Sequence, residues 1–193
     1  MDSTSVALPM LRLRFWLLAL SSLLLLSACK ADYEYTRGKC YVVFDNSKAL
    51  VPQLAAAMAG TPSVFCRVWK GSVQGAPAFY FADFTGKQQY VVFNAAQQKA
   101  TLVFGRNDSS GIIVGHTNFH GFRAFDMQCP VCTEMTDFNP RVPLTWSTES
   151  TLTCSKCHHI FDLNNLGYAD DGARLTEYRA QPPTGAYGVL YIQ

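Results

Sequence analysis

The chain has 193 residues, 49% of them hydrophobic, and a formal net charge of +2 at pH 7. This length favours one domain, with room for a small addition. The 16 basic and 14 acidic residues are mixed, without a run of lysines or arginines. A nucleic-acid-binding face needs clustered basic charge, so the composition argues against a nucleic-acid partner.

The first 28 residues have the features of an export signal. Arg12 and Arg14 precede a twelve-residue apolar stretch, Phe15–Leu26. A membrane-spanning helix needs about 20 apolar residues, whereas the apolar core of a secretory signal peptide has about 7–15. Residues 1–28 are therefore predicted to be a signal peptide, and its removal would leave a net charge of about +1.

The leader ends in Leu26-Ser27-Ala28-Cys29, which resembles the lipobox of bacterial lipoproteins. The resemblance implies that Cys29 carries the acyl chains, such as palmitate, and becomes the first mature residue. Several acyl chains on one residue anchor a protein stably to a membrane. An ordinary membrane anchor with an incidental cysteine is the alternative. Lys30 resembles the residue that follows the cysteine in lipoproteins of the outer membrane, so we expect a cell-envelope location, in the outer rather than the inner membrane.

A polar tether over 29–38 is expected to lead into one globular domain over 39–193. The domain begins with a strand candidate, Lys39–Phe44, which combines aromatic and β-branched residues. Polar side chains at 45–47 can cap a helix. A helix is predicted over Lys48–Ala59, because its large apolar residues recur at helical spacing and a glycine follows.

Beyond residue 60 the pattern is one of short strands broken by glycine, proline and asparagine. Such a succession favours a mainly β domain, with the helix above as its single helix. The predicted strands are Ser63–Trp69, Ala78–Ala82, Gln89–Phe93, Thr101–Phe104, Ile112–His116 and Phe122–Met127.

Four of the seven cysteines form two Cys-x-x-Cys motifs separated by 21 residues: Cys129 with Cys132, and Cys154 with Cys157. Each motif in a tight turn presents two thiolates, and two such turns complete a tetrahedral metal shell. The gap leaves room for a strand pair between the turns. Two disulfides or a dithiol redox site are the alternatives. No helical pattern follows either motif, unlike the redox motif of thioredoxins, so a metal site is favoured.

Two further cysteines, Cys40 and Cys66, lie in separate strand-like segments. Exported proteins meet an oxidising compartment, in which such a pair can form a disulfide. Two buried free thiols are the alternative, and the sequence does not decide between them.

Several stretches together resemble the Rieske iron–sulfur domain, as found in uncharacterised Rieske-like lipoproteins of Bacteroidetes. The resemblance covers residues 111–193 and implies an antiparallel Rieske-like β-fold with its two metal turns together at one end. The stretches that carry it are Ile112–Gly115, Gly121–Pro130 and Thr153–Leu163, with Leu175–Arg179 and Val189–Ile192 as closing strands.

The metal ligands depart from the Rieske pattern, which pairs Cys-x-His with Cys-x-x-His. Cys157 stands at the histidine position of the second turn, and Cys132 stands one residue after that of the first. Histidine ligation is what raises the reduction potential of a Rieske cluster. Four thiolates suit one Zn²⁺ or a single iron, as in rubredoxin, and a [2Fe–2S] cluster is the alternative cofactor.

The histidines are expected to support the site or to lie apart from it. His158 and His159 directly follow the second motif. Neighbouring strand residues point to opposite faces, so one of the two is expected in the second shell and the other in solvent. His116 and His120 are expected in a turn or on the surface.

The sequence contains no nucleophile elbow, P-loop or His-Glu-x-x-His motif, and Asp170-Asp171 fits a solvated turn. A closed four-cysteine zinc site has no open position for water, which favours a non-enzymatic role. The predicted function is a binding or structural role for a lipid-anchored metalloprotein. Electron transfer through a [2Fe–2S] cluster is the alternative. The membrane is the expected partner, and a redox or envelope protein partner is left unidentified.

Overall fold

The structure, a computed structural model, describes residues 40–134 and 142–193. The predicted signal peptide, Cys29 and the tether over 29–38 lie outside these residues. None of the helices in the described part has the length and apolar character of a membrane span. Three antiparallel sheets make up most of the regular structure, which confirms the prediction of a mainly β fold.

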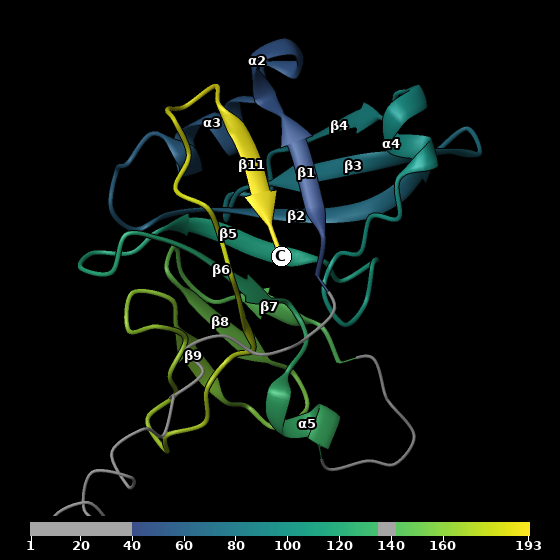
Figure 1. The fold of residues 1–193 in the computed structure, drawn as a ribbon. Coiled ribbons are helices and arrows are strands. Elements are labelled where there is room, and N and C mark those ends of the chain that lie inside the picture. Colours follow the sequence, from purple (N-terminus) through teal and green to yellow (C-terminus); the bar gives the residue numbers. More distant parts are fainter. Residues whose placement is uncertain (1–39, 135–141) are drawn as a thin grey trace, which may run out of the picture. The chain divides into compact units, whose positions relative to one another are not determined.

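The largest sheet has six strands in the order β10-β6-β5-β2-β3-β4 (Figure 1). The strand β5 has the predicted bounds, and four of its five residues are buried because layers cover both of its faces. The strands are β2 (Val64–Val73), β3 (Ala76–Ala82), β4 (Gln88–Val92), β5 (Ile112–His116), β6 (Phe122–Asp126) and β10 (Glu177–Tyr178).

The two faces of this sheet pack against separate hydrophobic cores. Successive residues of a strand point to opposite faces. On β5, Ile112 and Val114 therefore belong to the first core, and Ile113 belongs to the second. The first core includes residues of β1 (Val42–Asp45) and β11 (Val189–Ile192), which form a two-stranded sheet. The second core contains three of the four motif cysteines, and the fourth packs against it.

The single helix predicted over 48–59 is wrong, because the segment forms two short helices. The first, α2 (Asn46–Ala49), is capped by the Asp45 side chain and ends at Leu50, which has a left-handed backbone with φ of 52°. The second, α3 (Pro52–Met58), begins with a proline, which is well tolerated at the first position of a helix. The left-handed residue and the proline together interrupt the helix.

Two further helices were not predicted, because neither is long enough to show an apolar period. In α4 (Ala95–Lys99) the Asn94 and Gln97 side chains form a reciprocal capping box with each other's backbone N–H groups. The other helix, α5 (Pro130–Glu134), begins inside the first cysteine motif, so the expectation that no helix follows either motif is wrong for this one.

A three-stranded sheet carries the second motif: β7 (Leu144–Trp146), β8 (Thr151–Cys154) and β9 (Ile160–Asp162). The pair β7–β8 is the strand pair for which the gap between the motifs leaves room. One predicted strand is wrong: Thr101–Phe104 contributes only an isolated bridge between Tyr41 and Val103.

Candidate metal centre

The four motif cysteines converge on one point. Their Sγ atoms all lie within 4.8 Å of one another. Cys129 Sγ lies 3.5 Å from Cys157 Sγ, and Cys132 Sγ lies 3.7 Å from Cys154 Sγ. A disulfide has an S–S distance of about 2.05 Å, so none of the four cysteines is in a disulfide. The predicted meeting of the two motifs is thus confirmed, and both short contacts join one motif to the other.

The first motif follows β6 directly and is held by backbone hydrogen bonds to the segment before β7. Cys129 N donates to Val142 O over 3.0 Å, and Leu144 N donates to Met127 O over 2.8 Å. Pro130 then opens α5, whose first turn contains Cys132. The helical turn brings the two sulfurs of this motif to the same side of the chain.

Gln128, next to the first cysteine, is 4% exposed and makes three hydrogen bonds. Its Oε1 accepts from Val142 N at 2.9 Å, its Nε2 donates to Ser110 Oγ, and its own N–H donates to Asp126 Oδ1 at 2.6 Å. One side chain thereby ties the motif to the loop before β5 and to the segment before β7. Nothing in the local sequence pattern marks Gln128 as part of this network, because Ser110 lies 18 residues away in the chain.

Asp126 extends this polar network into the sheet. It is fully buried, and its Oδ2 accepts from Arg106 N at 2.7 Å and from the Tyr178 hydroxyl at 2.6 Å. Burial raises the pKa of Asp126, and these hydrogen bonds oppose the rise. A carboxylate directly after the apolar pair Ala124-Phe125 was the sequence signal for this network, because buried charges are kept only where donors surround them.

The second motif forms the turn between β8 and β9. Cys154 N donates to His159 O, and His158 N donates to Cys154 O, each over 3.0 Å. His158 has a left-handed backbone with φ of 61°, which reverses the chain directly after Cys157. A tight hairpin turn thus presents the second pair of thiols to the first.

Burial and contacts with neighbouring groups shift the pKa values of Cys129, Cys132 and Cys157. Burial raises the pKa of Cys129, and burial together with the neighbouring thiols raises the pKa of Cys132 to about 11. Burial also disfavours ionisation of Cys157. The backbone N–H of His159 and hydrogen bonds with the other three thiols outweigh this effect, so the pKa of Cys157 is lowered to about 6. Four thiolates at this spacing repel one another, so full deprotonation requires a cation among them.

The two neighbouring histidines have different surroundings. The pKa of His159 is raised first by Asp171, whose Oδ2 lies 2.7 Å from Nε2, and then by Cys157. The Nε2 atom of the ring therefore pairs with a carboxylate. His158 is exposed, His116 lies at the end of β5 against the Phe122 ring, and His120 is exposed in the loop before β6. Asp171, expected only as part of a solvated turn, is exposed but also holds His159.

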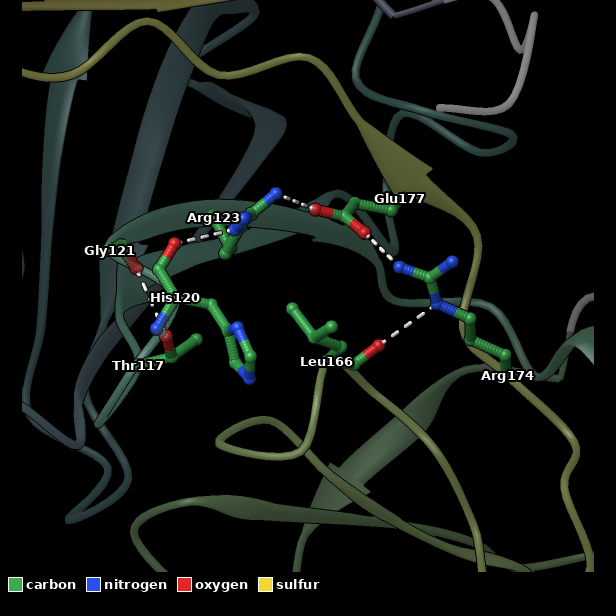
Figure 2. Close-up of polar contacts among 7 residues, drawn as sticks. All are labelled: Thr117, His120, Gly121, Arg123, Leu166, Arg174 and Glu177. Carbon is green, nitrogen blue, oxygen red and sulfur yellow. Dashed lines mark hydrogen bonds and ion pairs between the residues drawn. The ribbon is translucent and has the colours of Figure 1, made fainter. Parts of the chain in front are cut away.

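A separate ion-pair cluster lies between β6, β10 and the loop after β9. Figure 2 shows the Glu177 carboxylate between two arginines: Arg123 Nη1 lies 3.1 Å from Oε1, and Arg174 Nη2 pairs with Oε2. Glu177 is only 2% exposed. Arg174 Nε also donates to Leu166 O at 3.2 Å. The cluster contains no cysteine and fastens the loop after β9 to the large sheet.

Cys40 and Cys66 are free, buried thiols of the first core, so the disulfide that the sequence left open is not formed. Cys66 lies within β2 of the six-stranded sheet, opposite Val114 of β5. Cys40 lies just before β1, which belongs to the two-stranded sheet. Burial raises the pKa of both thiols, that of Cys40 to about 12. They are inert hydrophobic residues at neutral pH.

The sulfur geometry fits a tetrahedral ion. Zn–S bonds of about 2.3 Å place neighbouring sulfurs about 3.8 Å apart in a tetrahedron, close to the 3.5 and 3.7 Å contacts between the motifs. These four residues could therefore hold one metal ion with no further ligand. Comparisons with protein-family models, with curated proteins and with solved structures find no match to this chain.

Proposed function

We propose that this chain is a metalloprotein in which Cys129, Cys132, Cys154 and Cys157 hold a single structural ion, Zn²⁺ or mononuclear iron. The observation that carries the proposal is the convergence of four thiols within 4.8 Å, from two segments of the chain. The ion would join the β8–β9 turn to the segment after β6. Four thiolates leave no open position for substrate or water, so the site serves structure rather than catalysis.

The compactness of the cluster favours one ion over two irons. In a two-iron cluster each iron binds its own pair of thiolates, so sulfurs on different irons lie about 5 Å or more apart. All the sulfur separations here are below that distance. A [2Fe–2S] cluster with an electron-transfer role is the second candidate, and its motive is the resemblance of residues 111–193 to Rieske domains.

The cellular setting is also part of the proposal. The leader and the lipobox-like Leu26-Ser27-Ala28-Cys29 support export and lipid anchoring at the cell envelope, in the outer membrane. The antiparallel sheets and the adjoining metal turns support a Rieske-like domain whose cluster histidines are replaced by cysteines. Cys29→Ser should move the protein from the membrane fraction to the soluble fraction.

Elemental analysis and a visible spectrum of protein purified without oxygen test the metal site. One zinc per chain and no visible absorption are expected; one iron with thiolate-to-iron bands would identify the mononuclear iron form. Two irons with two labile sulfides per chain would favour the second candidate. Each of C129S, C132S, C154S and C157S should lose the ion, whereas Cys40→Ala, which removes a thiol outside the cluster, should keep it. A metal-free wild-type chain that also fails to bind added Zn²⁺ would overturn the proposal.

A further inference from the structure

Cys157 differs from the other three cysteines in its exposure. Cys129 and Cys154 are 0% exposed and Cys132 is 3% exposed, whereas Cys157 is only partly buried. Cys157 also lines a surface hollow of about 300 Å³, together with His158, His159, Ile160, Ala169 and Asp171. Solvent and small solutes therefore reach the cluster at this sulfur.

The surroundings of Cys157 also supply a second thiol. Cys129 Sγ lies 3.5 Å away, on the buried side of Cys157 and on the other motif. A metal-bound cysteine is a thiolate, and thiolates are the form of cysteine that attacks oxidants. Reactivity follows thiolate character and exposure, so a sulfur that has both, with a partner thiol beside it, is the first to be oxidised.

We propose that Cys157 is a modification site at which hydrogen peroxide oxidises the metal centre and releases its ion. The inference rests on the proposed four-thiolate site. The Cys157 sulfur attacks one peroxide oxygen, so that an S–O bond forms and the O–O bond breaks. The sulfur is oxidised by two electrons, and the peroxide is reduced to hydroxide, which takes up a proton to become water.

The second step uses Cys129. Its thiolate attacks the Cys157 sulfur, an S–S bond forms, the S–O bond breaks, and hydroxide leaves and is protonated to water. Only the thiolates of Cys132 and Cys154 would then remain to hold an ion, and two thiolates would hold it too weakly to keep it bound. The product is a disulfide that links the two motifs rather than one within a motif.

Peroxide treatment of the metal-loaded full chain tests this order of events. Ion release is followed with a chromogenic chelator, and disulfides are mapped after trypsin digestion without reduction. Trypsin cleaves after Arg141 and Lys156, so Cys157, Cys154 and the first motif fall on three separate peptides. We expect loss of the bound ion and a link between the Cys157 peptide and Cys129. Cys40 and Cys66, both buried outside the cluster, should stay reduced and serve as internal controls.

Substitutions of residues that line the hollow test whether peroxide reaches the cysteine cluster at Cys157. Ala169→Leu should narrow the hollow and slow ion release severalfold at unchanged metal content. Ala96→Leu makes the same change on the exposed surface of α4 and should leave the rate unchanged. Ile160, 57% exposed, can be shortened without loss of core packing, and Ile160→Ala should speed release.

The outcomes separate the two proposals. A chain that binds no metal before peroxide is added would refute the proposed function. A metal-loaded chain in which Cys132 or Cys154 is oxidised first, or whose ion leaves while Cys157 is still reduced, would refute this inference alone. A disulfide between Cys154 and Cys157 would overturn the role given to Cys129.

Discussion

Gln128 supports the four-cysteine cluster although it is not one of the candidate metal ligands. Its amide spans two separate segments, through Val142 N and Ser110 Oγ, directly beside the first cysteine. Because it is buried, water cannot replace these partners if the amide is lost. The position of Cys129 therefore depends on hydrogen bonds made one residue earlier.

Replacing Gln128 with Met should weaken metal binding about tenfold, the lower end of the usual effect of mutating the partners that orient metal ligands. Methionine keeps the length of the side chain but makes neither hydrogen bond. Competition with a chromogenic chelator measures the affinity. Gln98→Met on α4, where the amide donates to Phe93 O, is the matched control and should bind metal like wild type. Equal affinities for both variants would show that Gln128 does not position the site.

The sequence contained enough information for the ligands but not for their supports. Cys-x-x-Cys places two sulfurs on one ion by covalent spacing alone. Cys129 could therefore be paired with Cys132, and Cys154 with Cys157, without knowledge of the fold. Asp126 and Gln128 act through Tyr178 and Ser110, which lie 52 and 18 residues away in the chain. Contacts of that kind follow from sheet topology, which the strand pattern did not determine.

At the scale of secondary-structure elements, the predicted bounds were correct where local residues such as glycine mark the end of an element. The strand β5 was predicted with its observed bounds because its apolar residues are bracketed by Gly111 and a polar loop. The helix over 48–59 was predicted as one piece because the apolar period continues across Leu50. Pro52 was the signal for a new start, since a proline is favoured at the first position of a helix.

The pairing of β5 with β2 requires a glycine at position 115. A methyl group there would overlap the Val64 carbonyl oxygen and the Phe65 side chain. Gly115→Ala should therefore lower the free energy of unfolding by about 2–3 kcal/mol, as overpacking of a core does. Gly75→Ala is the matched control: nothing lies within 4 Å, and only its φ of 84° is unfavourable, so about 1 kcal/mol is expected. Urea denaturation measures both, and equal losses would contradict the steric argument.

For the molecule as a whole, the four-cysteine cluster belongs to only one of the two cores. Three of the motif cysteines pack with Phe161, Leu152 and Leu175 in the second core, whereas β1, β11 and α3 cover the first. Without an ion, four thiols at contact distance hold the β8–β9 turn against the segment after β6 only weakly. The two halves should therefore respond differently to loss of the metal.

Removal of the ion with a strong chelator should lower the melting temperature and remove amide hydrogen-exchange protection mainly over 142–176. Protection in β2, β3 and β11 should persist, because their core contains no ligand. Exchange measured by mass spectrometry with and without chelator tests this. Uniform loss of protection over the whole chain would show that the ion supports both cores equally.

The shared central sheet has a consequence for how the chain reaches its native pairing. Ile112 and Ile113 are adjacent, yet they fill different cores from the same strand. A slip of β5 by one residue would reverse both faces together and leave each core with side chains of the wrong shape. Mispaired states are thus penalised twice, so the correct alignment of one short strand is specified by both cores at once.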